Sequence, residues 1–301
     1  MSKPIRKRKQ KRLLEFFTLN VSVLPANHDN ETFYSRLIEN YYSNDIKVTF
    51  GKDFFYTLIH LSKMELNGTT VYYGVLSKFL QLKSIDWIKS DEIKNINSTS
   101  GFEIPQGFEG RKGMYEFVFI PKIHKVAFVK KGKIDDNIKK QGAPLIAIKN
   151  VLKIGFEQLI ENEQTVHVDI VQSQQVIDKI FNSTLLKLDL KLHYSNPSIG
   201  DDHEAFMDDL YRKTHASNID ISVQGSKESP IDTKSTFIEG NLHLVRKNGT
   251  AKAVIDTNGK QEKINTAAHP EVSSLTIEDY KSSLFTKIIK SIGTFLLNNG
   301  E

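Results

Sequence analysis

The sequence contains no cysteine, only one tryptophan and no long apolar run. Without cysteine, the protein has no disulfide framework, no thiolate metal site and no thiol nucleophile. No stretch reaches the roughly 20 apolar residues that are needed to cross a bilayer. The basic N-terminus is not a secretory signal, because Glu15 and Asn20 interrupt the apolar residues that follow it. We therefore expect a cytoplasmic protein.

Familiar catalytic and cofactor motifs are also missing. There is no GxxxxGKS/T phosphate loop, no GxGxxG after a strand, no HExxH and no GxSxG. The nine histidines are scattered along the chain, and a lone histidine in a regular element is usually structural. We predict no cofactor and no resident metal, and the missing motifs argue against a conventional enzyme.

Positive charge is concentrated in two places. Residues 1–12 contain seven Lys or Arg and no acid, and without them the net charge of +5 becomes −2. Residues 111–153 contain eleven Lys or Arg and three acids, which gives a local charge of +8. Clustered cations bind nucleic-acid phosphates without sequence preference, by releasing counterions. The alternative is a solubilising arm and a solvated, lysine-rich face.

We assign a candidate nucleic-acid surface to the N-terminal arm and to a predicted hairpin, MYEFVFIPKIHKVAFVKKGK (114–133). Alternation places Phe117, Phe119 and Phe128 of this hairpin in a core and leaves its lysines outside. The candidate surface consists of Arg6, Lys7, Arg8, Lys9, Arg111, Lys112, Lys122, Lys125, Lys130, Lys131 and Lys133. No helix-turn-helix, zinc-finger or RNA-recognition signature is present, so base readout is not predicted.

Apolar periodicity predicts an α+β fold. An antiparallel or mixed sheet forms the N-terminal section, and a β-α-β-α-β section follows it. The predicted strands are 15–24, 47–50, 53–62, 69–79, 116–120, 124–129, 165–171, 185–194 and 218–224, with a hairpin at 248–266. The predicted helices are 32–42, 142–160, 173–181, 201–215, 232–247 and a long amphipathic helix at 276–298.

The composition along the chain predicts three parts. Residues 1–13 form a basic disordered arm, and residues 14–140 form a strand-rich N-terminal domain. Residues 141–301 form an α/β C-terminal domain that ends in the amphipathic helix. Such a helix packs either on the body of the protein or on another copy of the chain.

A metal-dependent nuclease is the alternative interpretation of three polar residues. Asp169 lies on one predicted strand, and Asp189 and Lys191 share one face of another. In this interpretation the two carboxylates hold a metal, and the lysine orients the attacking water. However, the opposite face of the second strand is a row of leucines, which is also typical of a strand with one solvated face and no chemistry.

Several short strings together resemble a family of bacterial phage-defence proteins of similar length. They are LNVSVLP, YEFVFIPKIHKVAFV, KLDLKLHYSNP, THASNIDISVQ and NGTAKAVIDTNGK followed by HPEV. The arrangement is more distantly similar to RexA, the phage-exclusion protein of lambda-type lysogens. The resemblance implies an intracellular α+β protein that binds DNA, senses phage and acts with a membrane-bound partner such as RexB. It implies no site residues, because it has no catalytic signature to match.

Together these observations predict a non-enzymatic, sequence-nonspecific DNA-binding protein of a phage-exclusion system. RNA is an equal candidate ligand on charge alone, because it offers lysine the same phosphates. We expect a homodimer, formed through the C-terminal helix or an exposed strand edge. A metal-dependent nuclease effector and a protein–protein adaptor remain the alternatives.

Overall fold

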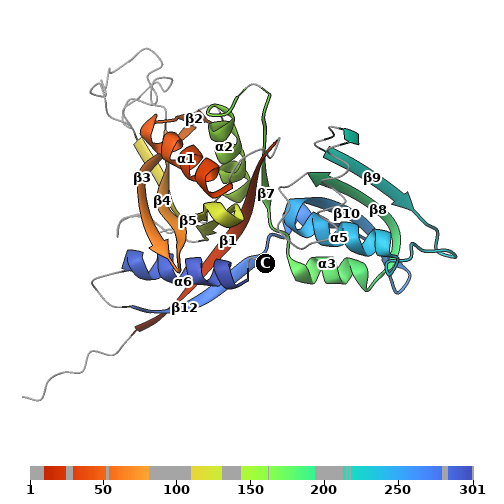
Figure 1. The fold of residues 1–301 in the computed structure, drawn as a ribbon. Helices are drawn as coiled ribbons and strands as arrows, with labels where there is room; N and C mark the ends of the chain where they lie inside the picture. The colour runs from red at the N-terminus through yellow and green to blue at the C-terminus, as the bar shows by residue number, and fades with distance from the viewer. Residues whose placement is uncertain are drawn as a thin grey trace, which may run out of the picture.

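A computed structural model describes most of the chain as two lobes (Figure 1). It describes residues 10–24, 30–51, 54–80, 110–130, 144–161, 163–193, 213–214, 216, 218–279 and 284–299. Arg6 to Lys9, Lys131, Lys133 and most of the helix expected at 201–215 therefore lie outside the described residues. No helix in the described part of the chain is both long and apolar enough to cross a membrane.

The larger lobe is built on an eight-stranded antiparallel sheet. Its strands are β1 (Gln10–Leu24), β2 (Val48–Thr49), β3 (Phe54–Leu66), β4 (Thr69–Leu80), β5 (Gly110–Ile120), β6 (Lys125–Val129), β7 (Thr165–Ile170) and β12 (Val272–Asp279). The order is β12-β1-β6-β5-β4-β3-β2, and β7 pairs with β1 as well. β12 pairs with Gln10–Phe17 of β1, and β7 pairs with Leu19–Leu24. The 15-residue strand β1 is therefore the central element of the lobe.

Helices cover both faces of this sheet. Helices α1 (Asn30–Ser43) and α2 (Leu145–Glu157) bury one face, and α6 (Leu284–Asn298) lies on the other (Figure 1). Strand β5 shows the alternation directly. Phe117 and Phe119 enter the core on the side of α1 and α2, while Val118 and Ile120 enter the core on the side of α6. Apolar residues at both phases are typical of a strand that is buried on both faces.

The smaller lobe has a second antiparallel sheet, and the helices described in this lobe pack on one of its faces. Its strands are β8 (Thr184–His193), β9 (Asn218–Gln224), β10 (Gly249–Thr257) and β11 (Lys260–Asn265), in the order β11-β10-β8-β9. Helices α3 (Gln174–Phe181) and α5 (Thr236–Asn248) pack on the face that carries the leucines of β8. The other face of β8 carries polar side chains. The predicted α+β class, with a C-terminal helix, is confirmed.

Two details of the expected topology are wrong. The strands of the β-α-β-α-β section were expected to share one compact sheet. Instead, β7 joins the large sheet, while β8 and β9 form the small one. In addition, residues 276–279 belong to strand β12, so the C-terminal helix begins at Leu284 rather than at 276. Leu275 and Ile277 alternate with the polar residues Ser274, Thr276 and Glu278 at period two, and this pattern fits the strand that pairs with β1.

The apolar face of α6 is used within the chain. Ile288, Ile289, Ile292 and Leu296 are buried against the large sheet, and the Phe295 ring packs edge-on against Phe16 of β1 at 5.5 Å between centroids. The helix therefore packs back on its own lobe, which is one of the two outcomes expected. Dimerisation of the chain stays a prediction.

Residues of the hairpin formed by β5 and β6 have structural roles. The turn after β5 is a short 3-10 helix (Pro121–Ile123) that ends at His124 in the left-handed region, with φ of 55°. The His124 ring lies against Tyr34 of α1, with 4.5 Å between ring centroids. Burial, assisted by the charge of Lys125, lowers the pKa of His124 to about 4. A neutral, packed imidazole at this turn is scaffold rather than an active site.

The contact between α1 and α2 predicts the cost of a single methyl group. An added Cβ at Gly155 of α2 would overlap with the Tyr41 ring of α1, and Tyr41 is fully buried. We expect Gly155→Ala to lower the free energy of unfolding by about 1–3 kcal/mol, as overpacking does. Urea denaturation measures this. Ile146→Ala on the same helix is the control, because Ile146 is 66% exposed, and equal losses in the two variants would contradict the prediction.

Candidate functional site

The described lysines of the basic hairpin are mostly engaged in local interactions. Lys130 forms an ion pair with Glu15 at 3.3 Å, and its ammonium lies 6.0 Å from the centre of the Phe17 ring. Lys122 is exposed and Lys125 is half-buried. The hairpin therefore presents less free positive charge than its sequence suggests, because β1 supplies an acid to it.

Antiparallel pairing nevertheless brings the two basic segments of the sequence to one end of the large sheet. The backbone N–H of Lys130 donates to the carbonyl of Glu15, and β5 pairs with the other side of β6. β1 and β5 both run antiparallel to β6. The first residues of both strands therefore extend beyond Lys130 in the same direction. We name this part of the lobe the basic end. It comprises positions Lys11, Arg12, Lys78, Arg111, Lys112 and Lys130.

Aromatic rings accompany the basic end. Phe55 of β3 and Phe79 of β4 stack at 5.2 Å with an interplanar angle of 12°. The Lys78 ammonium lies 3.8 Å from the centre of the Phe54 ring. Lysines interleaved with aromatic rings are common on surfaces that bind single-stranded nucleic acid, where rings stack on bases and cations contact phosphates. Because neighbouring strands of a sheet are rotated relative to one another, their ends diverge. The positions of the basic end are therefore spread along an extended edge.

A different group of polar residues lies where the two lobes meet. The carboxylate of Asp169 on β7 accepts from Nδ1 of His193 at the end of β8, at 2.8 and 2.9 Å to its two oxygens. The Lys149 ammonium of α2 donates to the same carboxylate at 3.2 Å. The side chain of Asp169 is 5% exposed. Three elements from both lobes thus converge on one buried charge.

The charge state of Asp169 follows from its partners. Burial acts to raise its pKa, but the hydrogen bonds and charges of His193 and Lys149 together outweigh it and hold the pKa below its ordinary value. Asp169 is therefore a carboxylate at neutral pH. An ionised carboxylate only accepts hydrogen bonds, so the Nδ1 of His193 carries the proton that joins them.

His167 completes this cluster. It lies two residues before Asp169 on the same face of β7, and its ring stacks on that of His193 with 5.1 Å between centroids. Burial, followed by the effect of His193, lowers the pKa of His167 to about 4. Two imidazoles in contact favour one neutral partner, since like charges repel. We call Lys149, His167, Asp169 and His193 the junction cluster.

The residues of the nuclease interpretation do not converge. Asp189 lies on the polar face of β8, where Ser222 donates to it at 2.6 Å and Lys187 pairs with it at 3.0 Å. It is four residues from His193, a distance of about 13 Å along a strand. Both oxygens of Asp169 already accept from His193. Within the described part of the chain, no group of three or more His, Cys, Asp or Glu side chains is arranged to hold a metal ion.

The junction also encloses polar atoms that have no hydrogen-bond partner among the described residues. They are Asn20 Oδ1, His167 Nε2, Gln172 Oε1 and Arg246 Nε. Around them, the Asn20 amide donates to the Lys247 carbonyl of α5 at 2.8 Å, and the backbone N–H of Gln172 donates to the Arg246 carbonyl. Buried polar atoms are normally satisfied. The contact between the lobes is therefore polar and incompletely matched.

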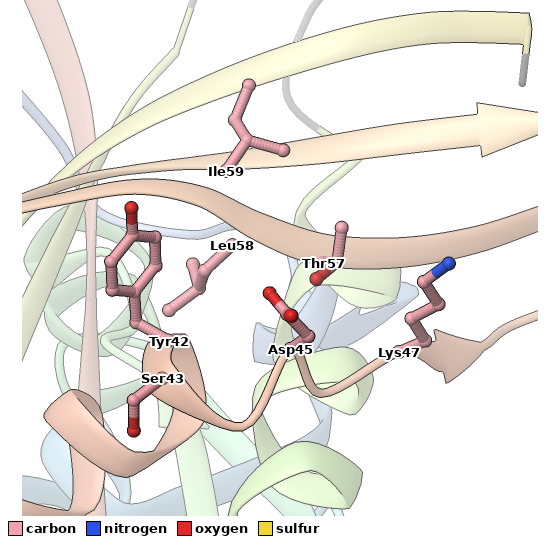
Figure 2. Close-up of a pocket in the computed structure, with 7 residues that line it drawn as sticks. All are labelled: Tyr42, Ser43, Asp45, Lys47, Thr57, Leu58 and Ile59. Carbon is pink, nitrogen blue, oxygen red and sulfur yellow. The ribbon is translucent and has the colours of Figure 1, made fainter. Parts of the chain in front are cut away.

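A shallow pocket lies between the end of α1 and strand β3. Figure 2 shows its lining residues Tyr42, Ser43, Asp45, Lys47, Thr57, Leu58 and Ile59. Asp45 and Thr57 lie close together, and the Lys47 side chain extends away from them (Figure 2). The Lys47 ammonium lies 5.1 Å from the centre of the Phe55 ring. The polar groups do not converge on a common point, so the pocket offers less chemistry than the junction cluster.

Sequence reasoning found one member of the junction cluster and missed three. Asp169 was singled out, but its partners were sought at Asp189 and Lys191. The usable signal was the alternation of β8, which puts His193 on the same face as these two residues. What the sequence did not reveal is that β7 belongs to the large sheet and that His193, the last residue of β8, contacts Asp169 across the junction.

Comparison with known proteins covers nearly the whole described chain. The family model of DUF4747, a domain of unknown function, matches residues 12–293. The chain belongs to the DUF4747 family. The matched region includes both lobes and every member of the junction cluster, and it begins within β1, after most of the basic arm. No curated protein matches the chain.

Removing the buried carboxylate tests the junction. In Asp169→Asn, the Lys149 and His193 side chains lose their anionic partner in a buried setting. Breaking a buried pair in this way costs about 3–5 kcal/mol, so we expect a loss of stability of that size in urea denaturation at pH 7.5. The matched control is Asp189→Asn, because Asp189 lies on the exposed face of β8 and its pairs should be worth at most about 1 kcal/mol. Equal losses would contradict the prediction.

The lowered pKa of His167 predicts how stability depends on pH. In the unfolded chain a histidine has a pKa of about 6.5, so below that pH the unfolded state takes up the proton first. The stabilisation is complete above pH 6.5 and is lost as the pH falls toward 4. Between pH 7.5 and pH 5 we expect His167 to account for a loss of about 2 kcal/mol.

This contribution is measured by urea denaturation at both pH values. His167→Leu should reduce the loss by about that amount, whereas His60→Leu, at an exposed position, should leave it unchanged. An undiminished loss in His167→Leu would show that His167 is not held neutral.

Proposed function

We propose that the protein binds nucleic acid without sequence preference, through the basic end of the large sheet and the arm that precedes β1. The observation that carries the proposal is the strand register, which brings basic positions from β1, β4, β5 and β6 to the same end of the sheet. The arm adds cations without a single acid. An extended basic edge suits an extended polyanion better than it suits a compact ligand.

Charge and aromatic character both support this ligand class. Lys130 shares its charge with Glu15, so much of the unbalanced charge comes from the arm and from Lys131 and Lys133, which follow β6 in the sequence. The aromatic stack of Phe55 and Phe79 lies beside Arg111 of β5, because Phe79 pairs with Arg111. Cations alone bind any phosphate backbone, whereas a half-buried ring such as Phe79 adds stacking with an unpaired base; Phe55 is buried and supports that ring from below.

The biological setting that we propose is phage exclusion in the cytoplasm, with DNA as the first ligand to test. The resemblance of several strings to phage-defence proteins supports this setting. A homodimer and a membrane-bound partner protein belong to the same proposal, and size-exclusion chromatography of the purified chain tests the dimer directly.

The salt dependence of binding tests the proposal. The full chain is titrated onto fluorescent duplexes of unrelated sequence at several salt concentrations. We expect similar affinities for all sequences and a steep linear fall of log K with log salt, with a slope of about −0.9 for each phosphate contacted. Replacing Arg6, Lys7, Arg8 and Lys9 by Glu should weaken binding to every sequence and flatten this slope by several units.

A matched variant separates this surface from general charge. Lys234→Glu with Lys260→Glu alters two exposed lysines of the smaller lobe, far from the basic end, and should leave the slope unchanged. The proposal is wrong if the arm variant and this control bind with the same slope, or if no duplex or single strand binds at low salt.

A further inference from the structure

The His193 imidazole in the junction cluster has one engaged nitrogen and one open nitrogen. Its Nδ1 lies 2.9 and 2.8 Å from the two oxygens of Asp169. Its Nε2 has no hydrogen-bond partner in the described part of the chain, and the side chain keeps 16% of its surface exposed. A carboxylate that accepts from Nδ1–H fixes the tautomer in which Nε2 carries a lone pair. The orientation is that of a general base rather than of a buried structural histidine.

The position of His193 on the small sheet keeps its side chain partly exposed, at 16%. His193 is the last residue of β8 and lies on the polar face of the small sheet, opposite the face that α3 and α5 cover. Lys191 lies two residues earlier on that same face and is exposed. On the other side, Lys149 and Lys153 come from neighbouring turns of α2, with side chains 25% and 41% exposed. Lysines from both lobes therefore lie near the junction cluster, where they add positive charge for a phosphate-bearing substrate, while Lys149 also pairs with Asp169 and Lys153 with Glu157 at 3.6 Å.

We propose that the Asp169–His193 pair is the general base of a ribonuclease centre, in which His193 activates the 2′-hydroxyl of bound RNA. This inference rests on the proposed nucleic-acid binding and deepens it by naming the cleavable substrate. In this scheme the nucleophile comes with the substrate. RNA carries such a hydroxyl beside each phosphorus, and DNA does not.

The step is balanced without an oxidant or a reductant. The 2′-hydroxyl gives its proton to Nε2 of His193, and its oxygen forms a bond to the adjacent phosphorus. The bond between phosphorus and the 5′-oxygen breaks, and that oxygen takes a proton from water. The imidazolium then returns its proton to solvent. The products are a 2′,3′-cyclic phosphate on one fragment and a 5′-hydroxyl on the other.

The remaining members of the cluster have positioning roles. Asp169 holds the His193 ring and stabilises its protonated form. Lys149 holds Asp169 from the side of α2, at 3.2 Å. His167 stacks on the His193 ring and limits its rotation. None of these three contacts the substrate in this scheme, so none is a catalytic residue.

The experiment uses the full chain and a 5′-labelled single-stranded RNA in the presence of EDTA. We expect cleavage that yields cyclic-phosphate ends. A matched oligonucleotide with one 2′-deoxy position should resist cleavage at that position, and DNA of the same sequence should remain intact. General acid–base groups contribute about 10²–10⁴-fold, so His193→Gln should slow cleavage at least about 100-fold while keeping a hydrogen-bond donor toward Asp169.

Two further variants separate chemistry from folding and from contaminants. His60→Ala, purified identically, alters an exposed histidine of β3 and should cleave like the wild type. Lys153→Ala removes a cation near the cluster and should weaken cleavage more than it weakens folding, as judged by thermal unfolding.

Binding of the same RNA is measured in every sample. Intact RNA in all samples, or equal cleavage by the wild type and His193→Gln, overturns the ribonuclease centre. If binding persists in that case, only this inference fails. If duplex DNA binds and this RNA does not, the inference fails and the proposed function stands; if neither binds, the proposed function fails.

Discussion

The pairing of β1 is the constraint on which the larger lobe depends. Its 15 residues pair with β12, β6 and β7, and alternate residues enter the cores on both faces of the sheet. Phe16 packs toward α6, while Leu19, Val21 and Val23 pack toward α1 and α2. A shift of one residue would exchange these two sets. Both cores therefore fix the same register, and the register in turn decides which basic positions share one end of the sheet.

The contact between the lobes is of a different kind from the cores. The cores are dense and apolar, whereas the junction combines one ionised carboxylate, two imidazoles, a lysine and several unmatched polar atoms. Burying a charge costs free energy that partners only partly recover. Such groups are common where a protein needs a defined arrangement of charge, and strong desolvation beside a specific partner is typical of functional sites. The junction cluster is the part of this molecule with these properties.

Sequence patterns predicted the elements better than their partners. The alternation in β5 and β6 and the Asn-Gly turn before Lys260 were sufficient for local structure, because turn chemistry and period-two patterns act over a few residues. They did not reveal that β7 pairs with β1, since strand partners are chosen by packing over long separations. For the same reason Asp169 was recognised while His193 was not. The helix expected at 276 failed over its first residues, where a short amphipathic pattern fits both periods and pairing with β1 decided for the strand.

The pairing of β1 with β12 has a consequence for how the protein is made. Gln10 lies opposite Asp279, so one of the first strands to be synthesised pairs with one of the last. Until then, one edge of β1 over Gln10–Phe17 has no native partner, and its apolar side chains lack the cover of α6. Pairings between such distant residues form slowly, and unpaired edges promote aggregation in the meantime. Positive charge at the start of β1 disfavours pairing of this edge with the same edge of another nascent chain, because like charges repel.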